Sequence, residues 1–321
     1  MTKRSRLKRR TLIAGGAAVM TALGLGACQT TQRTKTAGSP NARIGMNLLL
    51  WTSTPNEEHF SLLDNVKRWG FDGAEFPMFD VEGNHWQKLG KHCDELGLGR
   101  TASTAMPENG NPFSEDPYIR QGAVDFLKRC VDRSHELGAT VVCGPLYSPV
   151  GRLVGRGREE WEFEYAVAVL REASEYAQQA QIELAHEPLN RFETYVMNSQ
   201  KDGCKLVDAV GMPNFGLHYD TFHANIEEKD VNEAIRYAGS RIKHVHISEN
   251  DRSTPGKGQV HWEDNFAALK AIGYNQWLTI EAFGKALPEV AAATCIWRRM
   301  YESEEQLARD GLAFVKKSWQ G

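Results

Sequence analysis

The chain contains the stretch Ile182-Glu-Leu-Ala-His-Glu-Pro-Leu-Asn-Arg-Phe-Glu193, in which a short apolar run ends at Glu187 and breaks at Pro188. The apolar run predicts a buried strand, and the proline predicts that a polar loop follows it. An unpaired carboxylate in a dry core costs on the order of several kcal/mol, so Glu187 is expected to face water, a cation or a substrate. The stretch therefore predicts a barrel strand that ends by presenting a carboxylate.

Three further strand-like runs also end at a residue that can bind a metal ion. They are Phe215-Gly-Leu-His-Tyr-Asp220, Ile242-Lys-His-Val-His246 and Trp277-Leu-Thr-Ile-Glu281. Together with Glu187 they supply three carboxylates and one imidazole, a ligand set that suits manganese or magnesium better than a structural zinc. A purely structural metal site is the alternative, but such sites are usually closed by Cys and His.

Strand-like and helix-like patterns alternate along the chain after residue 42. Eight strands, each followed by a helix, fit the roughly 250 residues of a typical (β/α)8 barrel, in which functional groups lie at the C-terminal ends of the strands. The four candidate ligands occupy that end of strands five to eight. A doubly wound open sheet is the rival, but it would need a Gly-rich phosphate turn after the first strand, which the sequence lacks. We therefore predict an α/β fold with a single TIM barrel at residues 43–321.

The apolar spacing and the helix-breaking residues place the elements along the chain. The expected strands lie at residues 43–51, 72–75, 98–105, 140–144, 182–187, 215–220, 242–246 and 277–281. The expected helices lie at 57–69, 85–96, 117–137, 159–179, 198–210, 231–238 and 262–271, with a last helical region at 288–319. Since side chains alternate along a strand, His244 is expected one layer below His246. There it is either a donor to a ligand carboxylate or a core histidine bonded to the backbone.

The N-terminus is typical of an export signal. A basic region with the pair Arg9-Arg10 precedes an apolar stretch at residues 12–27, which is short for a bilayer-spanning helix, and Leu25-Gly-Ala-Cys28 ends it. The arginine pair resembles a twin-arginine signal and the last four residues resemble a lipobox. We expect residues 1–27 to be a cleaved signal peptide, Cys28 to carry a lipid, and residues 28–42 to be a flexible linker. The protein would then be periplasmic or membrane-anchored; a basic, disordered N-terminus is the alternative.

The charge distribution argues against a nucleic-acid partner. The chain has 38 basic and 41 acidic residues, a formal net charge of -3. Six basic residues and no acidic ones precede Cys28; without those six the count is 32 against 41, or -9. Contact with a membrane is expected only through the lipid anchor.

Four segments resemble the D-tagatose 3-epimerase and D-psicose (D-allulose) 3-epimerase family, within the xylose-isomerase-like barrels. They are Glu187-Pro-Leu-Asn-Arg-Phe-Glu193, Asp220-Thr-Phe-His-Ala-Asn-Ile-Glu-Glu228, the stretch from His246 through Ser-Glu-Asn-Asp-Arg252 to Pro-Gly-Lys-Gly258, and Thr279-Ile-Glu-Ala-Phe283. The similarity spans most of the chain from Arg43 onward. Within these segments, the NRFE box at residues 190–193, the box at residues 220–228 and the PGKG loop at residues 255–258 occur in register, which is a specific signal. A single carboxylate at the end of a strand would be a weak one.

The resemblance implies a metal-dependent enzyme that epimerises a ketose at C3 through a cis-enediolate intermediate. It implies that a divalent metal, usually Mn²⁺ with Mg²⁺ or Co²⁺ as alternatives, is bound by Glu187, Asp220, His246 and Glu281. Glu187 and Glu281 would also be the acid/base pair, one taking the C3 proton from one face and the other returning a proton to the opposite face. The substrate would be held by Glu193, His223 and Arg252. Relatives are commonly dimers or tetramers, so a homo-oligomer is expected.

Several alternatives to these roles stay open at this point. Glu193 and Arg252 would contribute little if they only paired as a salt bridge at the rim, and His223 would be structural if it capped the next helix. Pro188 and Ala224 depart from the family pattern at the pocket wall. An exported isomerase, epimerase or lyase acting on a keto-sugar or keto-glycoside is therefore a second hypothesis. A sugar-binding lipoprotein without catalysis is a third.

Overall fold

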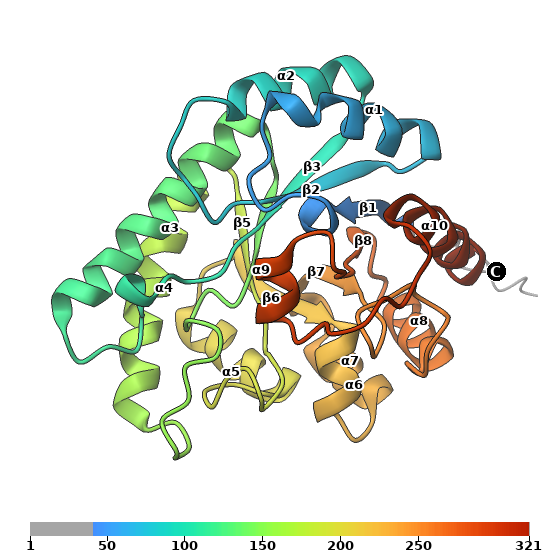
Figure 1. Ribbon diagram of the computed structural model, residues 1–321. Coiled ribbons are helices and arrows are strands. Elements are labelled where there is room, and N and C mark those ends of the chain that lie inside the picture. Colours follow the sequence, from blue (N-terminus) through green and yellow to red (C-terminus); the bar gives the residue numbers. More distant parts are fainter. Residues whose placement is uncertain (1–40, 321) are drawn as a thin grey trace, which may run out of the picture. The chain divides into compact units, whose positions relative to one another are not determined.

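The computed structural model describes residues 41–320, and these residues form one closed barrel of eight parallel strands. The strands pair in chain order, and the eighth returns to pair with the first. Figure 1 shows the helices arranged around the strands. The predicted TIM barrel is therefore confirmed. The predicted signal peptide, Cys28 and the linker as far as residue 40 lie outside the described residues.

The eight strands are short, and each lies within one or two residues of its expected start. They are β1 (Arg43–Asn47), β2 (Gly73–Pro77), β3 (Gly99–Ser103), β4 (Val141–Gly144), β5 (Glu183–His186), β6 (Phe215–Asp220), β7 (Ile242–Ile247) and β8 (Trp277–Ile280). The first strand is shorter than expected. Asn47 ends it, because its side-chain oxygen accepts the backbone N–H of Leu49 at 2.8 Å and starts the 3-10 turn η1 (Leu48–Leu50).

Ten α-helices are present within residues 41–320. They are α1 (Phe60–Trp69), α2 (Trp86–Leu96), α3 (Pro117–Leu137), α4 (Glu160–Gln179), α5 (Gln200–Val210), α6 (Thr221–Glu227), α7 (Val231–Ala238), α8 (Trp262–Ala271), α9 (Pro288–Ala293) and α10 (Glu304–Gln320). Further 3-10 turns are η2 (Glu57–His59), η3 (Glu108–Gly110) and η4 (Gly239–Arg241). In this part of the chain, none of the helices has both the length and the apolar character needed to cross a lipid bilayer.

Two of the helical predictions differ from the structure. The short helix α6 was not expected; it begins because the carboxylate of Asp220 accepts the backbone N–H groups of Phe222 at 2.6 Å and His223 at 3.3 Å. The single helical region expected at 288–319 is two helices, α9 and α10, separated by residues 294–303. Because these residues separate the two helices, α9 need not lie in the outer ring of helices with α10.

The N-terminal end of the barrel is closed by a tryptophan. Trp277 is buried at the start of β8, and its ring packs against Gly73 of β2 and Gly99 of β3. A Cβ atom added at Gly73 would lie 2.5 Å from this ring and 2.5 Å from the carbonyl oxygen of Gly99. Arg43 covers the ring with its guanidinium 4.0 Å from the ring centroid. Because this end is filled, a substrate can enter only from the C-terminal end of the strands.

The helix α9 lies over that C-terminal end (Figure 1). It is held by a small apolar cluster, separate from the main core, that consists of Leu49, Phe283, Ala291 and Ile296. Val290 of α9 lines the same pocket as Glu187, so this helix forms part of the wall above the candidate site.

Candidate metal centre

The structure brings all four predicted ligands to one place. Glu187 directly follows β5, Asp220 is the last residue of β6, His246 lies near the end of β7 and Glu281 directly follows β8. Asp220 and His246 are register partners on neighbouring strands. None of the four is more than 8% exposed. The side chains therefore converge in the interior, at the C-terminal end of the barrel.

The distances between these side chains suit a single bound cation. Nδ1 of His246 lies 3.2 Å from Oε1 of Glu281 and 3.7 Å from Oδ2 of Asp220. Glu187, Asp220 and His246 each offer one ligand atom, and these atoms lie within 4.8 Å of one another. A divalent ion contacts each oxygen or nitrogen ligand at about 2.0–2.6 Å, so ligand atoms of one ion lie roughly 3–4 Å apart. The set needs only a small contraction to reach that spacing.

The hydrogen bonding of His246 also fits a metal ligand. Its Nε2 lies 2.6 Å from a carboxylate oxygen of Glu75, which can only accept, so Nε2 carries a hydrogen. Its Nδ1 has no hydrogen-bond partner among the described residues and faces the oxygens of Asp220 and Glu281. A cation between Nδ1 and these oxygens would satisfy all three groups.

The electrostatics of the cluster favour a cation as well. Burial, together with the charges of Asp220 and Glu281, raises the pKa of Glu187 well above its ordinary value. Burial opposes the charged form of His246, but the charge of Glu281, among other carboxylates, raises the pKa of His246 well above its ordinary value. Both shifts arise because carboxylates crowd a buried site. A divalent ion would relieve this repulsion.

Arg252 is part of the same cluster. Its Nη1 lies 2.8 Å from Oε2 of Glu281 and 3.2 Å from Oδ2 of Asp220, and its guanidinium stacks on Phe222 at 3.7 Å from the ring centroid. Its backbone φ of 61° is in the left-handed region, which is uncommon for a residue with a side chain. The alternative of a rim salt bridge between Arg252 and Glu193 is wrong. Glu193 instead accepts a hydrogen bond from Asn190 at 2.7 Å.

His223 lies between the glutamate and the arginine. Its Nδ1 accepts the backbone N–H of Asn190 at 3.0 Å, and its Nε2 lies 3.6 Å from Oε1 of Glu187 and 3.0 Å from Nη2 of Arg252. Burial and the charge of Arg252 lower the pKa of His223. The capping alternative is wrong, since His223 lies within α6 and the following helix, α7, is capped by Asp230.

A pocket of about 360 Å³ opens above these groups. Its polar lining consists of three candidate ligands, Glu187, His246 and Glu281, and the three candidate substrate residues; Asp220 does not line it. Its walls are mainly apolar and include Leu49, Phe79, Val150, Phe283 and Val290. The arrangement gives a reactive floor at the bottom of an apolar funnel, a form common to small-molecule sites.

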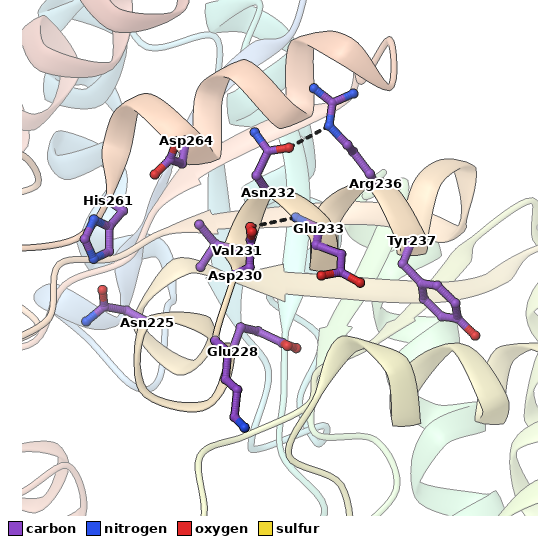
Figure 2. Close-up of a pocket in the computed structure, with 11 residues that line it drawn as sticks. Asn225, Glu228, Asp230, Val231, Asn232, Glu233, Arg236, Tyr237, His261 and Asp264 are labelled. Atoms are coloured by element: carbon purple, nitrogen blue, oxygen red, sulfur yellow. Dashed lines mark hydrogen bonds between the residues drawn. The ribbon is translucent and has the colours of Figure 1, made fainter.

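A larger hollow of about 890 Å³ lies elsewhere, beside α7 (Figure 2). Two pairs of its polar residues make local helix contacts: Asp230 accepts the N–H of Glu233 at 2.9 Å, and Asn232 accepts a hydrogen bond from Arg236 at 2.6 Å. None of the candidate ligands lines it. We therefore assign the candidate site to the smaller, deeper pocket.

Two buried residues of the site were missed from the sequence. Glu75 of β2 is fully buried and contacts His246, and Asn47 of β1 donates from Nδ2 to Glu281 at 3.2 Å. Neither alternative for His244 is found, because its Nε2 lies 2.7 Å from Oε2 of Glu75, which is not a predicted ligand, and its ring makes no hydrogen bond to the described backbone. The sequence signal for Glu75 is that it is an acidic residue inside an otherwise apolar strand at residues 73–77.

A second group of side chains lies next to the ligands. Cys143, His218, His244 and His246 place one sulfur or nitrogen atom each within 4.8 Å of one another, and all four are buried. Nδ1 of His218 lies 3.6 Å from Oε2 of Glu187. The ligand cluster thus rests on a polar layer inside the barrel rather than on an apolar core.

Comparison with known proteins agrees with this geometry. Residues 63–318 match the family described as xylose isomerase-like TIM barrel. The chain is 32% identical to a probable ketose 3-epimerase of Synechocystis sp., in a match covering 88% of this chain and 98% of that protein. It is 34% identical to an L-ribulose 3-epimerase of Mesorhizobium japonicum, covering 85% and 93%.

Among solved structures, a D-allulose 3-epimerase from Methylomonas sp. in complex with D-allulose is 28% identical. The match covers 87% of this chain and 98% of that chain, with a TM-score of 0.82. The fold, the buried His, Glu and Asp cluster and the two relatives above 30% identity point the same way. The chain therefore belongs to the ketose 3-epimerase family of xylose isomerase-like TIM barrels and is an isomerase.

Proposed function

We propose that this protein epimerises a ketose at C3, with Glu187 and Glu281 as the acid/base pair. The observation that carries the proposal is that both carboxylates reach the floor of one pocket from β5 and β8, two strands that are not neighbours in the barrel. Epimerisation needs a proton removed from one face of a carbon and another added to the opposite face. Two carboxylates that approach from different sides supply both steps.

Glu187, Asp220, His246 and Glu281 would hold a divalent cation, with Mn²⁺ expected and Mg²⁺ or Co²⁺ as alternatives. Such an ion acts as a Lewis acid that makes the proton next to a carbonyl more acidic. Support comes from the oxygen-rich donor set and from the unpartnered Nδ1 of His246. The order in which Glu187 and Glu281 act depends on which epimer enters the pocket.

The pKa of Glu187 favours its role in proton transfer. Burial and the charges of Asp220 and Glu281 raise the pKa of Glu187 well above its ordinary value, so this carboxylate holds a proton more readily than an exposed one does. Glu281 is instead held in place by Arg252 at 2.8 Å and Asn47 at 3.2 Å. The two carboxylates therefore differ in how they are held.

Glu193, His223 and Arg252 are proposed to hold the sugar hydroxyl groups. All three line the pocket, and Arg252 and His223 are oriented by neighbours before any substrate binds. Orientation matters because a misplacement of about 1 Å can cost on the order of a hundredfold in rate. The Nη1 atom of Arg252 contacts two proposed ligands, Asp220 and Glu281, so a sugar hydroxyl bound by Arg252 would lie next to the metal centre.

The test is an assay of free ketoses with the Mn²⁺-loaded protein. D-Fructose, D-tagatose, D-psicose and L-ribulose are each incubated and analysed for the C3 epimer. We expect turnover of at least one, and loss of turnover with retained sugar binding in Glu187→Gln. Retained turnover in that variant would contradict the assigned role. Failure with every free ketose would favour the second candidate below.

The second candidate is a reaction at a keto-sugar or keto-glycoside. The observation that favours it is the apolar upper wall, where Phe79 is 42% exposed and Val150 is 42% exposed beside the pocket. A glycoside with an apolar aglycone would cover these side chains, whereas a free sugar would leave most of them in water. Comparing kcat/KM for a free ketose and a matched aryl keto-glycoside separates the two candidates.

We further propose that the protein is exported and held at a membrane through a lipid on Cys28. The support is the basic and apolar pattern of residues 1–27 and the four-residue box that ends at Cys28. Membrane fractionation of cells with the parent chain and with Cys28→Ser tests it. The parent chain is expected with the membranes and the variant in the soluble fraction.

A further inference from the structure

Glu75 is the most densely hydrogen-bonded carboxylate near the site. It lies within β2, is 0% exposed, and pairs in register with Asn47 of β1 and Thr101 of β3. Its oxygens accept from Asn47 Nδ2 at 2.9 Å, Thr101 Oγ1 at 2.8 Å, Cys143 Sγ at 3.4 Å and His246 Nε2 at 2.6 Å, and His244 Nε2 approaches to 2.7 Å. A buried carboxylate is costly unless it is paired in this way, so the arrangement calls for a functional explanation.

One branch of these contacts orients the imidazole of His246. The contact at 2.6 Å keeps the hydrogen on Nε2, so the other nitrogen, Nδ1, is directed at Asp220 and Glu281. A ring rotated by half a turn would direct a carbon atom at them and would lose the bond to Glu75. The carboxylate therefore fixes both the orientation and the hydrogen position of His246.

A second branch reaches the ligand on β8. Nδ2 of Asn47 donates to Glu75 at 2.9 Å and to Glu281 at 3.2 Å. The amide cannot turn over, because its oxygen accepts the backbone N–H of Leu49 at 2.8 Å. One carboxylate on β2 thus orients two ligands that arise from β7 and β8.

We propose that Glu75 is a positioning residue of the metal centre, acting on His246 directly and on Glu281 through Asn47. Glu75 does not itself line the substrate pocket and is not one of the four proposed ligands. The inference rests on the proposed function, since it takes His246 and Glu281 to be metal ligands. It predicts that the affinity for the metal, more than the rate of the loaded enzyme, depends on Glu75.

The test is Glu75→Gln, which keeps the size of the side chain but replaces one accepting oxygen by an NH2 group. That group takes the place either of Oε1, which accepts from both His246 and Asn47, or of Oε2, which accepts from Thr101 and Cys143. In either placement the negative charge is lost, and a neutral amide oxygen accepts the N–H of His246 more weakly than a carboxylate does. We expect Mn²⁺ affinity of the apo protein, measured by calorimetric titration, to fall about 10- to 100-fold. The kcat at saturating Mn²⁺ is expected to change far less, so that excess metal rescues the variant.

The matched control is Glu162→Gln. Glu162 is also a buried carboxylate, 2% exposed, but it pairs with Arg156 and Tyr195 beside α4. It should lose stability without losing Mn²⁺ affinity. Circular dichroism and thermal melting of both variants separate loss of fold from loss of metal binding.

A second variant keeps the proposal testable if Glu75→Gln does not fold. Asn47→Leu breaks the branch to Glu281 and the cap of η1 but leaves the contact between Glu75 and His246 in place, so it is expected to weaken Mn²⁺ binding by less than Glu75→Gln. In the double variant the two effects should fall short of their product, because Glu75 acts on Glu281 through Asn47.

The outcomes distinguish this inference from the proposed function. If the parent chain binds one Mn²⁺ and both variants bind it within twofold of the parent, the inference is wrong and the proposed function stands. If the parent chain binds no divalent metal, both are wrong. Two tightly bound ions per chain would assign the histidines around Glu75 to a second metal site and would also overturn the inference.

Discussion

The two glutamates of the site have different surroundings. Glu281 receives hydrogen bonds from Arg252 at 2.8 Å and Asn47 at 3.2 Å. The nearest side-chain nitrogens to Glu187 are those of His218 and His223, both at 3.6 Å, which is beyond a normal hydrogen bond. Burial and like charges raise the pKa of Glu187, although the charges of His246 and Arg252 oppose the shift. The residues are equivalent in type but not in environment.

The first prediction concerns these two carboxylates. Glu187→Gln and Glu281→Gln keep the shape of the site but remove the group that carries the proton. We expect kcat to fall about 10²- to 10⁴-fold in each, the usual contribution of general acid/base catalysis. Initial rates at saturating Mn²⁺ and ketose measure this. A loss of less than tenfold in either variant would remove that residue from the proton-transfer pair.

The second prediction concerns Arg252. Its planar fork contacts Glu281 and Asp220 through Nη1 and His223 through Nη2, which a lysine cannot reproduce. Arg252→Lys is expected to lower kcat/KM by at least about tenfold, since a misplaced group costs on the order of a hundredfold. The control is Arg191→Lys, because Arg191 is an exposed partner of Glu227 and such pairs contribute little. Equal effects of the two changes would contradict the role of Arg252.

At the scale of the elements, the closed end of the barrel positions the open one. Trp277 fills the space beside Gly73 and Gly99, so β2, β3 and β8 approach closely at their N-terminal ends. This fixes the strand ends that carry Glu281 on β8 and Glu75 on β2. The glycines are needed for close approach rather than for an unusual backbone conformation.

The third prediction follows from that packing. Gly73→Ala places a methyl group 2.5 Å from the ring of Trp277 and 2.5 Å from a carbonyl oxygen, so something must shift. We expect the free energy of unfolding to fall by about 1–3 kcal/mol, measured by urea denaturation. Gly157→Ala is the control, because nothing lies within 4 Å of the added atom there. Equal stability of both variants would contradict the close packing of Trp277 against Gly73 at the N-terminal end of the barrel.

Local signals account for the elements that the sequence predicts well. The helix α3 has the expected bounds, because Asp116 caps the N–H of Tyr118 and Gly138 adopts a φ of 76° at its end. The helix α6 was missed because its cap, Asp220, is also the end of β6 and no loop separates the two. Neither propensity nor spacing reveals a residue that serves both elements.

The residues of the site also divide into those that the sequence predicts and those that it does not. Glu187, Asp220, His246 and Glu281 are recognisable because each one ends a strand, and the topology of a barrel brings strand ends together. Glu75 and Asn47 are not recognisable, because their importance lies in contacts between strands that are 171 and 234 residues apart in sequence. Such contacts follow from register, which a single sequence does not give.

At the scale of the whole molecule, the barrel at residues 41–320 contains every residue of the proposed site. The predicted signal and anchor at residues 1–28 would therefore decide where the reaction occurs but not how. This separation is a testable property of the chain.

The fourth prediction uses that separation. A chain that lacks residues 1–40 is expected to have the same kcat/KM as the full chain, within about twofold, because no site residue is removed. Measuring both proteins with the same ketose and Mn²⁺ checks it. A large loss in the shortened chain would show that the N-terminal residues contribute to the site.

The fifth prediction concerns metal removal. A ligand that binds only the folded state stabilises it, by about 2.7 kcal/mol at a free concentration one hundred times Kd. Adding a chelator to the Mn²⁺-loaded protein should therefore lower its melting temperature. The same chelator should have no effect on Asp220→Asn/His246→Gln, in which two ligands are changed. An unchanged melting temperature of the parent chain would count against a bound ion.

We expect Glu187 and Glu281 to exchange a proton with the carbon next to a ketose carbonyl at a metal centre. Proton NMR of a ketose incubated in D2O with the Mn²⁺-loaded protein tests this proton exchange. The account predicts deuterium at C3 together with the C3 epimer, and loss of both after chelation or in Glu187→Gln. Epimer formation without deuterium at C3, or deuterium exchange that persists after the metal is removed, would contradict it.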